Sequence, residues 1–215
     1  MKQRILSLMR DRMFQAGFSK VTLDELADEL GISKKTLYKY FSGKEDLALQ
    51  AIRFQFAEVG EAFTAIHASH HTFMEKLHAI MMMMREHVGR ISSYALQDMR
   101  KHAPQLWEEI EKLRRERILS QLETIIRRAR EEGVLRPEVE ERMLVKILLA
   151  SVEAVANPAA QAELRLPMHE ILSSMFRILF EGALTDEARH SLRIFPEAEE
   201  TDPASPRRSP SGREQ

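Results

Sequence analysis

The sequence contains no cysteine among its 215 residues. Disulfide bonds, thiolate metal sites and cysteine nucleophiles are therefore excluded together, and such a chain suits a reducing compartment. The N-terminal stretch also lacks a long apolar run, because charged residues interrupt it every few positions. We therefore expect neither a signal peptide nor a membrane span there, and we expect a cytoplasmic protein with no membrane partner.

Residues that interrupt helices are few. Glycine and proline number 8 each, in a chain that is 44% hydrophobic and 30% charged. Apolar residues recur at helical spacing along most of the chain, and no segment shows the alternation of a strand. The sequence therefore predicts an all-α protein with helices over residues 3–16, 23–30, 34–41, 45–68, 73–90, 92–101, 104–133, 138–156 and 168–181.

The chain divides into three parts. A small helical domain is expected over residues 1–47, and a larger helical domain over residues 48–195. Residues 196–215 are rich in proline, serine and charge, so we expect a disordered tail there. The formal net charge of −1 argues against a polybasic protein but leaves room for a local basic patch.

The stretch from Thr22 to Glu45 carries the clearest local signals. Thr22 and Glu25 have the spacing of a capping box, and Gly31 stands where a left-handed residue ends a helix. Ser33 is placed to cap a short third helix. The spacing of Ser42 and Glu45 predicts a second capping box at the start of the fourth helix.

The short third helix has two different faces. Leu37 and Phe41 fall on one side, where they must face the core. Lysine and threonine can donate to base edges in the major groove, and tyrosine and lysine suit phosphate oxygens. The alternative is that the tyrosines pack on the first helix and the lysines form a solvated face. The side chains expected to contact bases are Lys35, Thr36 and Lys39, and those expected to grip the backbone are Thr22, Tyr38, Tyr40 and Lys44.

These residues resemble the N-terminal domain of the TetR/AcrR family of bacterial transcriptional regulators. The resemblance rests on the run from Thr22 to Ser33, on Lys35 to Phe41 and on Lys44 to Leu47, and it covers about residues 1–50. It implies that residues 1–47 form a helix-turn-helix DNA-binding domain, whose surface includes Ser33 and Lys34 as well. Residues 48–195 would then form the domain for effector binding and dimerisation. It also implies a homodimer on a near-palindromic operator, and a helical domain that binds a small effector and spreads the two DNA-binding heads.

An apolar pocket is expected in the second domain. Four consecutive methionines, residues 81–84, point in every direction around their helix, and methionine adapts to varied apolar shapes. Each of the side chains concerned could equally be an ordinary core residue. The predicted pocket residues are Phe56, Phe63, Phe73, Met81, Met84, Met99 and Trp107.

The last two expected helices are apolar on more than one side, which favours a partner. A two-fold axis would pair them into a four-helix interface, with a single monomeric core as the alternative. The predicted interface residues are Met143, Ile147, Ala150, Ser151, Ala154, Ile171, Met175 and Leu179.

Other functions find less support. His67, His70 and His71 could present imidazoles to a metal, but their run is predicted to be a loop without an acidic residue. No catalytic triad, phosphate loop or buried carboxylate pair is evident, so we expect neither an enzyme nor a cofactor. The sequence thus predicts a repressor released by a small, lipophilic effector. A DNA-binding protein controlled by a protein partner is the alternative, and a filled second core would favour it.

Overall fold

A computed structural model of the protein describes residues 1–193, and the predicted disordered tail lies outside them. The described residues form an all-α fold, with a single isolated β-bridge between Leu135 and Leu184. The helices are α1 (Lys2–Ala16), α2 (Leu23–Leu30), α3 (Lys34–Tyr38), α4 (Lys44–Ala68), α5 (Phe73–Val88), α6 (Ser93–His102), α7 (Pro104–Glu131), α8 (Glu141–Val155), α9 (Pro158–Leu164), α10 (Met168–Ala183) and α11 (Asp186–Arg193).

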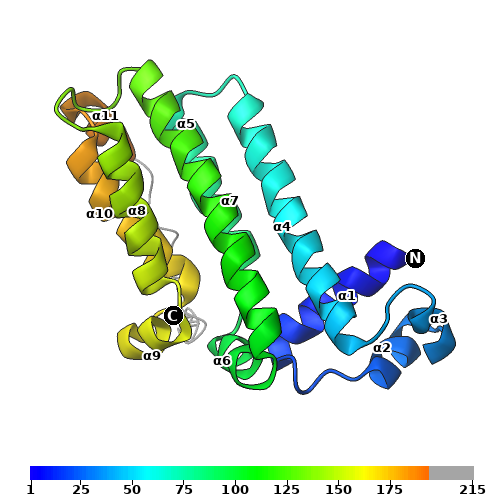
Figure 1. The fold of residues 1–215 in the computed structure, drawn as a ribbon. Coiled ribbons are helices and arrows are strands. Elements are labelled where there is room, and N and C mark those ends of the chain that lie inside the picture. The colour runs from blue at the N-terminus through cyan, green and yellow to red at the C-terminus, as the bar shows by residue number, and fades with distance from the viewer. Residues whose placement is uncertain (194–215) are drawn as a thin grey trace, which may run out of the picture.

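The helices form a small head and a larger body (Figure 1). The head holds α1, α2 and α3. In the body, the long helices α4, α5 and α7 lie side by side, with α8 and α10 beside them on the side away from the head. Two hydrophobic cores follow this division. Leu47 and Ala51 of α4 lie in the core of the head, whereas Phe63 of the same helix lies in the core of the body. Helix α4 therefore runs through the expected domain boundary at residue 47 and belongs to both parts.

The head core also takes in residues from far along the chain. Met99 of α6 and Leu106 of α7 are buried with residues of α1 to α4.

Within residues 1–193, no single helix combines the length and apolarity that a bilayer crossing needs. Only α8 and α9 taken together do so, and they are bent by 76°.

Local capping explains where several helices begin and end. Thr22 accepts a hydrogen bond from the Glu25 amide and the Glu25 side chain reaches back, so the predicted capping box is present. Gly31 ends α2 in the left-handed region with φ of 65°. An equivalent capping box of Thr72 and Glu75 begins α5. Together these caps satisfy amides that the first helical turn leaves unpaired.

Two local predictions in the head were wrong. Helix α3 ends at Tyr38 rather than Phe41. The second capping box does not form, because Gly43 caps α4 without a side-chain hydrogen bond. The amide of Ser42 instead donates to the Asp46 carboxylate at 2.8 Å.

The C-terminal helices also differ from their predicted bounds. Helix α8 begins after Glu140, whose carboxylate accepts a hydrogen bond from the Met143 amide, and not at residue 138 as predicted. Pro158 lies just beyond the predicted helix over residues 138–156, and it begins a further helix, α9, which was not predicted; its missing N–H is not needed at that position. Helix α10 continues past Gly182 to Ala183, and α11 was not predicted.

A buried carboxylate ties α6 to the end of α1. Asp98 is only 4% exposed, and it accepts hydrogen bonds from the Ser19 amide at 2.7 Å and from the Ser19 hydroxyl. His102 Nδ1 lies 3.0 Å from the same carboxylate. Next to this contact, the Ser92 amide donates to the carbonyl of Phe14 at 3.0 Å. A buried carboxylate requires such partners, and here Ser19 supplies two of them from the chain segment that links α1 to α2.

The charge of Asp98 is stabilised by these donors. Burial alone would raise the pKa of Asp98, but the hydrogen bonds from Ser19 and the neighbouring His102 outweigh it and hold the pKa below its ordinary value. Asp98 is therefore ionised near neutral pH, and it binds the head to α6 as a charge-assisted acceptor.

Gly17 allows this close approach. Its φ is 89°, and an added Cβ would lie 2.8 Å from Asp98 side-chain atoms. We predict that Gly17→Ala lowers the free energy of unfolding by about 1–3 kcal/mol, because it combines backbone strain with a clash. Urea unfolding measures this change.

Gly60 provides the matched control. It lies inside α4, and an added Cβ would meet no atom within 4 Å. Gly60→Ala should therefore raise the free energy of unfolding by about 0.5–1 kcal/mol. Equal effects of the two substitutions would contradict the role assigned to Gly17.

Candidate DNA-binding surface and ligand cavity

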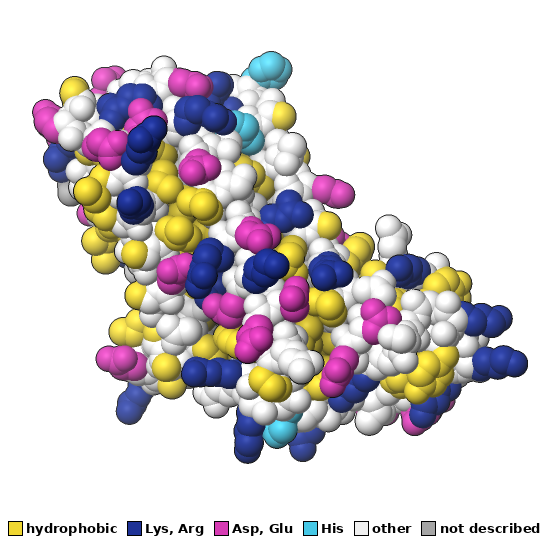
Figure 2. Space-filling model, in the orientation of Figure 1, with side chains coloured by type: hydrophobic (Ala, Val, Ile, Leu, Met, Phe, Trp, Pro, Cys, Tyr) yellow, Lys and Arg dark blue, Asp and Glu magenta, His cyan; other side chains and the backbone are white. Residues whose placement is uncertain are grey.

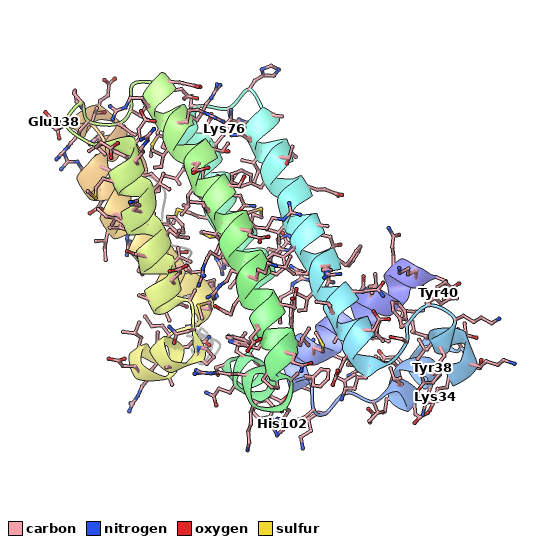
Figure 3. The ribbon with its side chains drawn as sticks, in the orientation of Figure 1. Lys34, Tyr38, Tyr40, Lys76, His102 and Glu138 are labelled. Atoms are coloured by element: carbon pink, nitrogen blue, oxygen red, sulfur yellow. The ribbon has the colours of Figure 1, made fainter. Side chains whose placement is uncertain are left out.

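Helix α3 exposes the side chains that suit DNA contact and buries the others. Leu37 is 1% exposed, and Phe41 just beyond the helix is 4% exposed. Lys35 and Lys39 are exposed, as are Tyr38 at 52% and Tyr40 at 41%. Tyr38 and Tyr40 project from the end of the molecule that carries α3 (Figure 3). They therefore do not pack into the head core, which was the alternative considered from the sequence.

Figure 2 shows Lys and Arg side chains projecting from this same end of the molecule. A helix that presents cations and hydrogen-bonding side chains from an exposed corner suits the major groove, which admits an α-helix. Helix α2 lies beside α3 and completes the helix-turn-helix.

Three hydroxyl groups of the predicted DNA-binding surface are already engaged within the head. Ser33 accepts from the Thr36 amide at 3.1 Å, and the two hydroxyls lie 2.9 Å apart. Thr22 donates to the Glu25 carboxylate at 2.8 Å. These hydroxyl groups cap the starts of α3 and α2. Any contact that they make with DNA would come in addition to this capping role.

Lys34 forms an ion pair with Asp24 of α2 at 2.9 Å. This hydrogen bond raises the pKa of Lys34 above its ordinary value. Both side chains are largely exposed, so the pair contributes little to stability. Its effect is to hold the Lys34 ammonium toward α2.

Lys44 is partly buried, which the sequence alone did not indicate. Its Nζ is 4.3 Å from the centroid of the Phe18 ring, which is a cation–π distance. Burial lowers the pKa of Lys44 below its ordinary value, against the charges of Asp98 and Glu25. Lys44 therefore supports the packing of Phe18 besides being a candidate phosphate ligand.

An apolar cavity of about 240 Å³ lies among the long helices of the body. Its walls come from α4, α5 and α7, with Phe14 of α1, Met99 of α6 and Phe176 of α10 also contributing. Among the predicted pocket residues, Phe56, Phe63, Met84, Met99 and Trp107 line it.

Two predicted pocket residues do not line the cavity. Phe73 packs in the core at the start of α5, with its ring centroid 6.2 Å from that of Phe180. Met81 lies on α5 outside the wall, and its neighbours Ile80, Met83 and Met84 border the cavity instead. The methionine run alone does not tell which of its members face inward, because that depends on how α5 is rotated.

A few polar side chains interrupt the apolar walls. Glu111 and Arg114 of α7 form an ion pair at 2.5 Å, and Arg114 also donates to the carbonyl of Ala156. The second carboxylate oxygen of Glu111 is buried without a hydrogen-bond partner. The other polar wall residues, which the sequence analysis missed, are Gln55, His87, Arg117 and Gln121.

The histidine run does not form a metal site. His67 lies inside α4 rather than in the predicted loop, and its ring stacks on Phe63 with an interplanar angle of 4°. Burial lowers the pKa of His67 below its ordinary value. Throughout residues 1–193, no group of three or more His, Asp or Glu side chains is placed to hold a metal ion. The metal-responsive alternative therefore has no support in the described residues.

The predicted interface residues separate into two sets. Met143 and Ile147 are 58% and 43% exposed, Ala150 and Ala154 are exposed, and Ser151 and Leu179 are half-buried. In contrast, Ile171 and Met175 are only 4% and 9% exposed, so both are already buried by the chain itself. Ile178 of α10, at 68% exposed, was missed. Figure 2 shows hydrophobic side chains gathered where α8 lies.

The fold and this exposed helix-turn-helix define a DNA-binding transcriptional regulator. Residues 5–51 match the model of a family described as bacterial regulatory proteins, tetR family. The matched segment spans α1 to α3 and the start of α4. The N-terminal domain is therefore a DNA-binding domain of the TetR/AcrR family, as the resemblance of its residues predicted.

Similar proteins cover nearly the whole chain. An uncharacterized HTH-type transcriptional regulator of Bacillus subtilis, YvaF, is 24% identical over 188 residues, which is 87% of this chain and 97% of that protein. A TetR/AcrR regulator of Thermobifida fusca has the same fold, with a TM-score of 0.57, 23% identity and coverage of 84% and 97% of the two chains. FadR of Bacillus subtilis, solved in complex with stearoyl-CoA, has a TM-score of 0.61, 14% identity and coverage of 85% and 99%.

Lys39 gives a direct test of the DNA-binding surface. We predict that Lys39→Ala weakens binding to DNA by about 1–3 kcal/mol while the melting temperature stays within error, because the side chain is exposed. Lys112→Ala, an exposed lysine on α7, should leave DNA affinity unchanged. Fluorescence anisotropy with a labelled duplex measures the affinity. A loss of thermal stability in Lys39→Ala would contradict the assignment.

Proposed function

We propose that the protein is a homodimeric repressor that leaves its operator when a small, largely apolar effector occupies the cavity. Lys35, Thr36 and Lys39 contact bases in this proposal, and Tyr38, Tyr40 and Lys44 contact phosphates. Exposed cations on a short helix at one corner of the molecule support this division.

The observation that carries the effector proposal is the cavity itself. An apolar cavity of about 150 Å³ holds benzene, so a volume of about 240 Å³ suits a larger apolar body. The few polar groups on its walls are what small-molecule sites use to orient a ligand. The structure of FadR with stearoyl-CoA supports the proposal by showing that a protein of this fold binds an acyl-chain ligand.

The cavity lies next to the connection between head and body. Phe14 of α1 and Met99 of α6 border it, and these two helices are joined by the bonds of Ser92 and Asp98 to the end of α1. A ligand that moves α6 or α4 must therefore move the head as well. This gives two sites and a shared structural element, which an allosteric mechanism requires.

The homodimer is proposed to form through α8 and α10. Met143, Ile147 and Ile178 expose large apolar side chains on these helices. A two-fold interface would remove them from water and hold two heads at a fixed spacing. Control by a protein partner remains the second candidate, but the presence of a ligand-sized cavity favours the effector.

Filling the cavity tests the effector proposal. We predict that 1-octanol changes the fluorescence of Trp107, which is the sole tryptophan of the sequence and borders the cavity. It should also weaken binding to an operator duplex, selected from a random pool, by about 5- to 150-fold. Val59→Phe, which places a larger side chain in the cavity wall, should abolish both responses.

The matched control is Met82→Phe. Met82 is 50% exposed on α5 and does not border the cavity, so both responses should persist. Equal responses of Val59→Phe and the wild type would contradict an effector site in this cavity.

The dimer has its own test. We predict that Ile147→Glu converts the dimer to a monomer in sedimentation velocity, because a carboxylate would have to be desolvated in an apolar contact. DNA affinity should fall with it, since the two heads are then no longer linked. Met82→Glu places the same charge on an exposed methionine of α5 and should leave the dimer intact. A dimeric Ile147→Glu variant would move the interface elsewhere.

A further inference from the structure

A chain of hydrogen bonds runs from the head to the cavity wall. Arg10 of α1 donates to the side-chain oxygen of Gln55 on α4 at 3.1 Å. The amide nitrogen of Gln55 lies 3.1 Å from Nδ1 of His87 on α5. Gln55 and His87 both border the cavity. Three helices are thus joined by two consecutive hydrogen bonds, and the last group of the chain faces the proposed ligand site.

The side chain of Arg10, where the chain of hydrogen bonds begins, is fixed by burial and by further hydrogen bonds. Its side chain is only 12% exposed, and it also donates to Asp11 at 2.9 Å and to Glu58. The guanidinium is a donor at every nitrogen and cannot accept a hydrogen bond. Its position and its hydrogen-bonding sense are therefore both fixed.

The sense of the whole chain follows from that constraint. Since Arg10 can only donate, the Gln55 oxygen must face it, and the Gln55 NH₂ group must face His87. His87 Nδ1 is then an acceptor, and the neutral imidazole carries its proton on Nε2. Within residues 1–193, His87 Nε2 makes no hydrogen bond, and this nitrogen is not fully buried.

We propose that His87 reads a hydrogen-bond acceptor on the effector, such as an uncharged carbonyl oxygen, and that the relay His87–Gln55–Arg10 reports this contact to α1. This inference rests on the proposed function and defines the ligand class of the same cavity. With an acceptor at Nε2–H, every hydrogen bond of the relay points the same way, and bonds arranged in this manner strengthen one another.

A ligand that offers only a donor is disfavoured at this position. It would need the other tautomer of His87 and a reversed Gln55 amide, which would place the NH₂ group against Arg10. A neutral ligand is favoured over an anion, because the walls are mainly apolar and a charged group would lose more of its hydration there. The class that remains is an apolar molecule bearing a neutral acceptor oxygen.

Two matched probes test the proposal on the full-length protein. 2-Octanone and 2-methyl-1-octene differ only in that a methylene group replaces the carbonyl oxygen. Their dissociation constants are measured through Trp107 fluorescence, and the quantity compared is the ratio of the alkene value to the ketone value. This ratio should fall about fivefold in His87→Phe, which keeps the ring but removes the N–H group. His70→Phe, in the exposed loop before α5, should retain the wild-type ratio.

The tautomer is tested separately by ¹⁵N NMR of the histidine side chains at pH 8.5. The proton of His87 should be on Nε2 in the wild type. In Gln55→Glu it should move to Nδ1, because a carboxylate offers only acceptors, and the preference for the ketone should disappear. The ketone should also shift the Nε–H resonance of Arg10 in the wild type and leave it unshifted in Gln55→Met.

The failures can be told apart. A proton on Nδ1 of His87 in the wild type would overturn the relay, and so would equal ratios of the dissociation constants in the wild type and His87→Phe. In both cases the effector site itself would stand if both probes still bind and still release the protein from DNA. An Arg10 resonance that responds equally in Gln55→Met would overturn the relay's reach to α1. Binding of neither probe would overturn both this inference and the effector site.

Discussion

The carboxylate of Asp98 is buried between the two parts of the molecule, and its hydrogen bonds hold them together. Ser19 donates to it from the segment that leaves α1, and α6 carries it at the lower end of the body. Because a buried charge without donors is unstable, this contact persists only while α6 and the head keep their relative position. Gly17 completes the joint, since any side chain there would strike Asp98. The head cannot turn freely on the body.

The cavity borders the same helices that fix the head on the body. Its walls include residues of α1, α4 and α6, which are the helices that carry or hold the head. A ligand that changes the spacing of α4 and α6 would therefore also move the head, which contains α3. The relay from His87 to Arg10 adds a second, polar route to α1. A packed interior of this kind passes a small displacement on rather than absorbing it.

The head was predictable because its signals are local. Thr22 with Glu25, Gly31 and Ser33 each act within four residues, and all three behave as the sequence indicates. Ser42 with Glu45 has the same spacing as the first pair and yet forms no box, because Asp46 captures the Ser42 amide instead. Pro158 likewise has two permitted places, after a helix or at its first position, and Asn157 decides between them by capping α9. Long-range contacts could not be predicted, since nothing near Asp98, Gln55 or His87 in the sequence reveals their partners.

The central claim is that an occupied cavity moves the two heads of a dimer. The absence of cysteine allows one spin label per protomer through Asp28→Cys, an exposed position on α2. Electron paramagnetic resonance then measures the distance between the two labels with and without saturating 1-octanol. The distance should change in the labelled protein with an open cavity and stay constant when Val59→Phe is added. An unchanged distance at saturation, while 1-octanol still releases the protein from DNA, would contradict the account.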